Sequence, residues 1–301
     1  MQSLISKPPN KKKHLNTPNS NNSYYLFFIA ITAATFILFV FYSRQTDPRH
    51  ICSTVGPITP AQTIIADEFA TSTIPLVTIF HYATAHDIPQ QTKNEIRKPL
   101  DVLQSLGPCN FLVFGIGHDA LMWDSFNPRG TTLFLEEDPK WTISSLRRFP
   151  ILRAYTVRYN TRLMEANALL LSYKKNCGAV DGDDHPLKDD RRCRLALGEF
   201  PIEVYDRDWD VIMIDAPRGY FPSAPGRMAV IYSAAVMARG RKKAGVTHVF
   251  LHDVDRAVEK LYAEEFLCMK YRVGGVKKLW HFVIPPAVNI TDTVHGFCLN
   301  G

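Results

Sequence analysis

Ionisable side chains follow two apolar runs of this 301-residue chain, at the point where each run ends. Asp215 follows residues 209–214, and His252 and Asp253 follow residues 247–251. Carboxylate and imidazole groups can take a proton from a hydroxyl group, and they can also hold a divalent cation. If both runs are parallel strands, their carboxyl ends meet at one edge of a sheet, where ligands of such sheets bind. We therefore expect these three residues to form one catalytic site.

A glycine-containing loop follows an earlier apolar run. It contains Gly115 and Gly117, which let a ligand approach the backbone closely, and Asp119, which precedes a predicted helix with free amides. Glu136 ends the next apolar run, nineteen residues after Gly117, a spacing that suits an acid binding ribose hydroxyls. Glu137, one residue further on, is the alternative for this role. The loop and the acid together predict a site for a nucleoside-containing cofactor.

Two cofactors fit this loop. Gly115, Gly117 and Ala120 match the dinucleotide fingerprint, so NAD(P) is one candidate. However, Asp119 would place an acid where a pyrophosphate needs neutral or positive surroundings, and the chain contains no Tyr-x-x-x-Lys. A sulfonium cofactor that carries an amino group tolerates an acid there. The residues favour S-adenosylmethionine and leave NAD(P) as the alternative.

The apolar runs alternate with helical patterns. Strands are expected at residues 111–114, 131–135, 151–157, 209–214 and 247–251, with a closing hairpin at 270–273 and 279–284. Helices are expected at residues 59–69, 92–106, 120–126, 139–149, 164–174, 225–238 and 259–268. Continuous apolar strands are typical of parallel sheets that helices cover on both faces. We predict an α/β fold with a doubly wound, mostly parallel seven-stranded sheet, the Rossmann-like sheet of S-adenosylmethionine-dependent methyltransferases.

A membrane anchor is predicted near the N-terminus. Residues 24–42 form a run of nineteen residues without a charge, about 28 Å long as a helix, with tyrosines at both ends. Four lysines precede it, which predicts a cytosolic N-terminus and a lumenal catalytic part. The expected organisation is a cytosolic tail (1–23), an anchor (24–43), a stem (44–58), a methyltransferase domain (59–288) and a C-terminal tail (289–301).

A net charge of +6 is a feature of many nucleic-acid-binding proteins. Residues 1–44 contain five basic side chains and no acid, so they account for +5, and the remaining 257 residues sum to +1. The positive charge therefore marks membrane orientation, and we expect no nucleic-acid partner.

Six cysteines follow the predicted anchor, where a lumen would allow disulfides. Cys177 and Cys193 flank a polar insertion and are the favoured pair, although six cysteines permit fifteen full pairings. Asn289 begins a glycosylation sequon on the same side of the membrane.

Several long blocks resemble a known family, the plant glucuronoxylan 4-O-methyltransferases, over residues 60–286. They are Val113–Asp119, Leu121–Trp123, Thr131–Trp141, Asp215–Tyr220, Ala224–Met228 and Thr247–Val254. The resemblance implies a Golgi type II membrane enzyme that transfers a methyl group from S-adenosylmethionine to O4 of glucuronic acid on glucuronoxylan. The same family includes methyltransferases that act on arabinogalactan, which is the alternative acceptor.

Methyl transfer to a sugar hydroxyl requires a base, and the residues at the strand ends are the candidates for it. Asp215 or His252 is expected to be the base, while Asp253 orients the site or, with Asp215, holds a divalent metal ion. Arg218 and Arg227 are expected to bind the carboxylate of the acceptor, because guanidinium groups match carboxylates. Sugar stacking on Trp123, Trp141 or Trp280 is less expected than core packing. The oligomeric state stays open.

Two other function classes compete with methyl transfer. Asp253-Val254-Asp255 follows a strand as the metal-binding motif of a glycosyltransferase would, although residues 206–208 and 208–210 match the same pattern. The irregular-xylem-type relatives are less clearly enzymes, so a non-catalytic role in xylan deposition is the second alternative.

Overall fold

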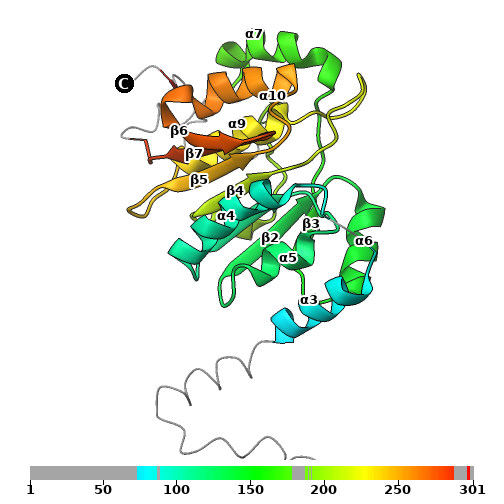
Figure 1. Cartoon of the computed structure of the whole chain (residues 1–301). Coiled ribbons are helices and arrows are strands. Elements are labelled where there is room, and N and C mark those ends of the chain that lie inside the picture. Colours follow the sequence, from blue (N-terminus) through cyan, green and yellow to red (C-terminus); the bar gives the residue numbers. More distant parts are fainter. Residues whose placement is uncertain are drawn as a thin grey trace, which may run out of the picture. The chain divides into compact units, whose positions relative to one another are not determined.

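The computed structural model describes residues 73–86, 89–177, 187–188, 190, 192–287 and 297–298. These residues belong to the compact unit that spans Phe69–Gly301 (Figure 1). The predicted tail, anchor and stem, the helix expected at 59–69 and the sequon at Asn289 lie outside the described residues. No helix in the described part of the chain is long and apolar enough to cross a membrane.

The strands form one seven-stranded sheet in the order β3-β2-β1-β4-β5-β7-β6. The first five strands are parallel, and β7 runs antiparallel to both β5 and β6. The strands are β1 Asn110–Phe114, β2 Thr131–Glu136, β3 Ala154–Thr156, β4 Val211–Ile214, β5 Thr247–Leu251, β6 Arg272–Val276 and β7 Leu279–Ile284. The predicted mostly parallel, seven-stranded sheet is confirmed. The third strand is shorter than expected.

The helices connect and cover these strands (Figure 1). They are α3 Thr73–Thr84, α4 Lys93–Leu106, α5 Ala120–Ser125, α6 Pro139–Arg148, α7 Ala166–Asn176, α8 Ile202–Tyr205, α9 Met228–Arg239 and α10 Ala257–Tyr262. A π-helical turn, Ala263–Leu267, continues α10. Short 3₁₀ turns lie at Leu163–Glu165 and Met269–Tyr271. Helix α3 was not expected from the sequence.

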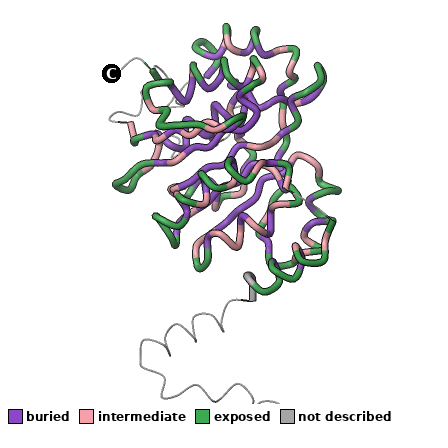
Figure 2. The backbone as a smooth tube through the Cα atoms, viewed as in Figure 1, coloured by how far each residue is buried: buried purple, intermediate pink, exposed green. Residues whose placement is uncertain are grey.

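Alternate residues of the strands pack on opposite faces of the sheet, because successive side chains of a strand point to opposite sides. Leu112 and Ile212 belong to a core that includes α9 and the π-helical turn. Phe111 and Met213 belong to a second core with residues of α4 and α5. Figure 2 shows the buried strands between partly exposed helices. The continuous apolar strands of the sequence follow from this burial on both faces.

Two disulfides tie surface segments to the core. Cys177–Cys193 closes the polar insertion, as predicted from the sequence. Cys268–Cys298 was not predicted, and it holds a segment beyond the predicted domain boundary at residue 288. Phe297 in that segment is buried, with its ring 5.3 Å from Phe266. Part of the C-terminal segment therefore packs as core.

The connections fix where a ligand can bind. The chain moves from β1 outward to β2 and β3, then returns to β4 on the other side of β1 and continues to β5. Helix α5 after β1 packs in one core and helix α9 after β4 packs in the other, so the chain continues from these neighbouring strands to opposite faces of the sheet. A doubly wound sheet has its ligand crevice at the carboxyl edge there.

Candidate active site

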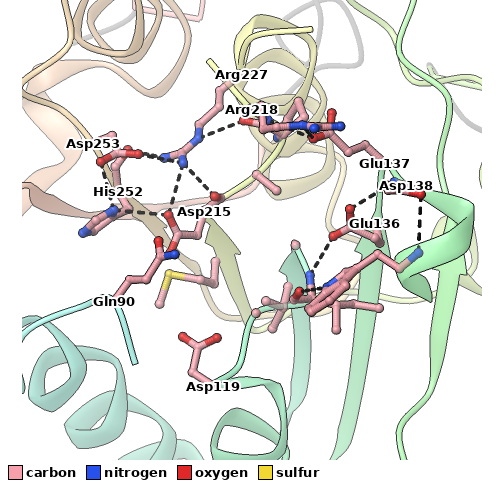
Figure 3. A pocket seen from close by; sticks show the side chains of 18 of the residues that line it. Gln90, Asp119, Glu136, Glu137, Asp138, Asp215, Arg218, Arg227, His252 and Asp253 are labelled. Carbon is pink, nitrogen blue, oxygen red and sulfur yellow. Dashed lines mark hydrogen bonds and ion pairs between the residues drawn. The ribbon is translucent and has the colours of Figure 1, made fainter. Parts of the chain in front are cut away.

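A cavity of about 470 Å³ lies beyond the carboxyl ends of β1, β2, β4 and β5 (Figure 3). This volume is within the usual range for small-molecule sites. All ten site residues predicted from the sequence line it: Gly115, Gly117, Asp119, Glu136, Glu137, Asp215, Arg218, Arg227, His252 and Asp253. The topology therefore brings together residues that are up to 138 positions apart, from Gly115 to Asp253.

The loop after β1 packs closely against the loop after β4. Gly115 has φ +111°, a conformation that favours glycine, and a Cβ atom there would lie 2.9 Å from the Cβ atom of Ala216. At Gly117 a Cβ atom would lie 2.2 Å from Asp119 Oδ1. Gly115 is therefore needed for the close packing of the cavity wall, whereas a side chain at Gly117 would force the Asp119 side chain to move.

Glu136 ends β2 with its carboxylate fixed by the backbone. Its Oε2 accepts a hydrogen bond from the Ile116 amide at 2.9 Å, and its Oε1 accepts one from the Asp138 amide at 3.0 Å. Burial raises the pKa of Glu136, although these hydrogen bonds oppose the rise. Each carboxylate oxygen has a second lone pair. Glu136 can therefore accept further hydrogen bonds from hydroxyl groups in the cavity.

Glu137 and Asp119 are held differently. Glu137 Oε1 pairs with Arg218 Nε at 2.6 Å, so its carboxylate is turned toward the loop after β4. Asp119 Oδ2 accepts a hydrogen bond from Trp123 Nε1 at 2.8 Å. Burial and the nearby carboxylate of Asp215 raise the pKa of Asp119. Of the two adjacent glutamates, Glu136 is the better placed to meet a ligand.

His252 lies among three carboxylates. Its Nδ1 is 3.2 Å from Asp215 Oδ1 and 3.3 Å from Asp253 Oδ1, and its Nε2 is 3.5 Å from Glu95 Oε1. Burial alone would lower the pKa of His252, but Asp215 and Asp253 outweigh it and raise the pKa to about 9. The imidazole is therefore protonated at neutral pH. A protonated imidazole has no lone pair with which to accept a proton.

Arg227 is a buried cation at the centre of this cluster. Its Nη2 lies 2.8 Å from Asp253 Oδ2 and 3.2 Å from Asp215 Oδ1. Its Nη1 donates a hydrogen bond to the His252 carbonyl oxygen at 2.7 Å. The residue is only 4% exposed. In this arrangement the guanidinium joins the ends of β4 and β5, and its hydrogen-bonding groups are directed at the protein rather than at the open cavity.

The two carboxylates remain charged because of these partners. Burial would raise the pKa of Asp253, but His252, Arg227 and Arg256 hold it well below its usual range. The pKa of Asp215 is also lowered, by His252, Arg227 and Gln91 against the effect of burial. Asp253 has φ +60°, a left-handed conformation that is uncommon for residues other than glycine. Such backbone conformations are typical of functional sites.

Asp215, His252 and Asp253 are also the residues that could hold a metal ion, since one ligand atom of each lies within 4.8 Å of the others. As the side chains are arranged, Arg227 fills the position between the two carboxylates, and Arg256 lies 2.8 Å from Asp253 Oδ2. An ion would have to displace a guanidinium and deprotonate His252. This arrangement does not fit a metal ion.

Sequence reasoning missed two residues, one just before α4 and one in its first turn. Gln91 Nε2 donates a hydrogen bond to Asp215 Oδ2 at 2.9 Å. Glu95 accepts hydrogen bonds from the Thr92 and Lys278 amides, and it faces His252. The Thr92-x-x-Glu95 spacing is a capping-box signal, visible in the sequence as the start of a helix. Nothing in that signal places the helix beside β5.

The raised pKa of His252 predicts a pH-dependent stability. Its folded pKa of about 9 lies above the 6.5 of an unperturbed histidine. The stabilisation is therefore fully present below pH 6.5 and is lost as the pH rises through 9. We expect urea unfolding to show wild type losing about 3 kcal/mol more than His252→Gln between pH 6 and pH 9.5. Parallel pH dependence of the two proteins would contradict a protonated His252.

The comparisons with known proteins agree with this geometry. The model of the IRX15/IRX15L/GXM family matches residues 94–282, which include all ten site residues. The chain belongs to the IRX15/IRX15L/GXM family. Arabinogalactan O-methyltransferase 2 of Arabidopsis thaliana is 51% identical over 271 residues, covering 88% of this chain and 92% of the relative. Arabinogalactan O-methyltransferase 1 of the same plant is 53% identical over 252 residues, covering 83% and 86%.

Glucuronoxylan 4-O-methyltransferase 1 of Arabidopsis thaliana is 46% identical over 208 residues, covering 69% of this chain and 72% of the relative. Among solved structures, a precorrin-6y C5,15-methyltransferase of Geobacter metallireducens is 14% identical with a TM-score of 0.35, covering 68% of this chain and 92% of that chain. That likeness is too distant to carry an argument. Because its close relatives are O-methyltransferases, this member of the IRX15/IRX15L/GXM family is an O-methyltransferase, which implies S-adenosylmethionine as methyl donor.

Proposed function

We propose that the chain methylates O4 of glucuronic acid side chains on arabinogalactan. The observation that carries the choice of polymer is the greater and longer similarity to arabinogalactan O-methyltransferases, 51–53% identity, compared with 46% for the glucuronoxylan enzyme. The sequence resemblance alone favoured glucuronoxylan, which becomes the second candidate. The similarity to the glucuronoxylan enzyme covers less of both chains.

The cavity suits S-adenosylmethionine, which supplies an electrophilic methyl group when bound. Glu136 would hold the ribose hydroxyls, because its two carboxylate oxygens face the cavity with free lone pairs. Asp119 would face the amino group of the methionine portion, beside the Gly115–Gly117 loop. The loop is lined by acids, which attract a cation and disfavour a pyrophosphate. This is why the cavity fits a sulfonium cofactor better than a dinucleotide.

Asp215 is the proposed base. It lines the cavity, and its side chain is 30% exposed, whereas His252 is 10% exposed and protonated. A sugar hydroxyl becomes strongly acidic as its oxygen forms a new bond to carbon, so a carboxylate with a low pKa can accept the proton at that stage. His252 and Arg227 then stabilise the charge of the cluster and fix the orientation of Asp215. They are positioning residues.

Arg218 is the proposed partner of the acceptor carboxylate. Its side chain is 52% exposed, and among the described residues its guanidinium pairs with Glu137 through Nε, while its backbone amide also donates to Glu137. The two terminal amino groups are then available for a bidentate pair with a uronate. Arg227, the other arginine expected in this role, is assigned instead to the buried cluster.

We also infer a Golgi membrane location with the catalytic part in the lumen. The support is the uncharged run at 24–42 and the lysines that precede it. The disulfides Cys177–Cys193 and Cys268–Cys298 agree with an oxidising compartment.

Labelled S-adenosylmethionine tests the proposed function directly. The purified chain is incubated separately with arabinogalactan and with glucuronoxylan, and the methylated sugar is identified after hydrolysis. We expect 4-O-methylglucuronic acid from arabinogalactan at a kcat/KM at least tenfold above that from glucuronoxylan. Preferential methylation of glucuronoxylan would favour the second candidate. Arabinogalactan pretreated with a glucuronidase is the control acceptor and should receive no label.

A further inference from the structure

The loop between β4 and α9 exposes two neighbouring aromatic rings, one of which lines the cavity. Tyr220 is 68% exposed and lines the cavity, and Phe221 is 37% exposed. Their ring centroids lie 5.2 Å apart in an edge-to-face arrangement. The proposed mechanism uses neither ring. Large aromatic side chains left exposed beside a binding cavity are typical of recognition surfaces.

Backbone hydrogen bonds hold this loop in a fixed position. The Gly226 amide donates to the Arg218 carbonyl oxygen at 2.9 Å and closes the loop on itself. The Met164 amide donates to Pro222 O at 3.0 Å, and the Leu163 amide donates to Ala224 O at 2.8 Å. The base of the loop is also tightly packed, since a Cβ atom on Gly219 would lie 2.8 Å from Glu259 Oε1. The loop therefore presents Tyr220 on an ordered support.

The position of Tyr220 indicates what it would bind. Two residues before it, Arg218 offers its terminal amino groups to an anionic sugar in the cavity. A ring at the edge of the same cavity would meet the next part of the acceptor, which in a polysaccharide is another sugar ring. The carbon-bound hydrogens of a pyranose face pack on an aromatic ring, while its hydroxyl groups stay in water.

The tryptophans are less suited to this role. Trp123 is buried, and its Nε1 is committed to Asp119. Trp141 donates from Nε1 to the Ile116 carbonyl oxygen beside the cofactor loop. The guanidinium of Arg272 covers the ring of Trp280 at 4.2 Å from its centroid. Of the exposed rings that line the cavity, Trp141 lies beside the cofactor loop, whereas Tyr220 lies on the loop that carries Arg218.

We propose that Tyr220 forms a sugar-binding subsite that holds the pyranose ring next to the glucuronic acid of the acceptor. This inference rests on the proposed function, because it assumes a polymeric acceptor with a uronic acid. The subsite contributes to the affinity for the polymer and takes no part in proton transfer. Replacing its ring should therefore alter KM for the polymer and leave kcat nearly constant.

The test uses the full chain in detergent and compares Tyr220→Ala, Tyr220→Phe and Phe80→Ala. Phe80 on α3 is 72% exposed and does not line the cavity, so its variant controls for loss of an exposed ring. We expect KM for arabinogalactan to rise about five- to tenfold in Tyr220→Ala and to return to the wild-type value in Tyr220→Phe. The affinity for S-adenosylmethionine should be equal in all four proteins.

Two readouts separate failure of this inference from failure of the proposed function. If wild type methylates arabinogalactan and Tyr220→Ala shows the same KM, the subsite is wrong and the proposed function stands. If wild type methylates neither polymer, the proposed function fails, and gel retardation by arabinogalactan then tests the Tyr220 subsite separately. Weaker retardation of Tyr220→Ala than of wild type supports the subsite, and equal retardation refutes it. A change of oligomeric state in Tyr220→Ala would instead assign the rings to contact between copies of the chain.

Discussion

Asp215→Asn is expected to lower kcat for methyl transfer by about 10²–10⁴-fold, the usual effect of removing a general base. The amide has nearly the same shape as the carboxylate and can still accept a hydrogen bond from Gln91, but it cannot take a proton from the acceptor. The cavity is otherwise unchanged, so the affinity for S-adenosylmethionine should remain within a fewfold of wild type. Initial rates with labelled cofactor and isothermal titration measure the two quantities.

Asp138→Asn is the matched control for this substitution. Asp138 lines the same cavity, but its Oδ1 caps α6 by accepting hydrogen bonds from the Lys140 and Trp141 amides. Asparagine caps helices about as well as aspartate, so this variant should keep its stability and most of its kcat. A kcat of Asp215→Asn that matched the control would remove Asp215 from the mechanism.

Arg227→Met is expected to destabilise the fold by about 3–5 kcal/mol, because it removes one of the two buried cations that the partly buried carboxylates of Asp215 and Asp253 share. Methionine fills much of the same volume, so the loss reports mainly on charge. Urea unfolding at pH 7 measures it. Activity should fall as well, since the orientation of Asp215 depends on this pair.

Arg218→Met provides the comparison for stability. The Arg218–Glu137 pair is 2.6 Å long, but the arginine side chain is 52% exposed. Exposed ion pairs contribute about 0–1 kcal/mol, so this variant should unfold at nearly the wild-type urea concentration. If both variants lost the same free energy of unfolding, the burial of Arg227 would not explain how its ion pairs stabilise the fold. The same Arg218 variant is expected to bind uronate acceptors more weakly.

Much of the site was predictable from residues at strand ends. Gly115, Glu136 and Asp215 each follow an apolar run, and parallel strands carry the ends of such runs to one edge of the sheet. The pattern of alternating strands and helices was enough to place them together. The same logic located His252 and Asp253, which follow β5.

The protonation state and the supporting contacts were not predictable in this way. Gln91 contacts Asp215 across 124 positions of sequence, and only the tertiary packing of α4 creates that contact. Arg227 follows a Pro-Gly pair, which indicates an exposed loop, yet the residue is buried because two carboxylates converge on it. His252 was a candidate base because histidine side chains often accept protons near neutral pH. Asp215 and Asp253 make it a cation, and Asp215 comes from the end of another strand.

The buried Phe297 has a consequence for how the enzyme is produced. A protein cut at residue 288 would keep the whole sheet and every site residue, but it would uncover the rings of Tyr232 and Phe266, which Phe297 contacts. The same cut would leave Cys268 without Cys298 and create a free thiol beside an apolar opening. Thiols in such places cross-link chains and promote aggregation. Recombinant forms should therefore retain the last residues, and affinity tags belong at the other end of the catalytic domain.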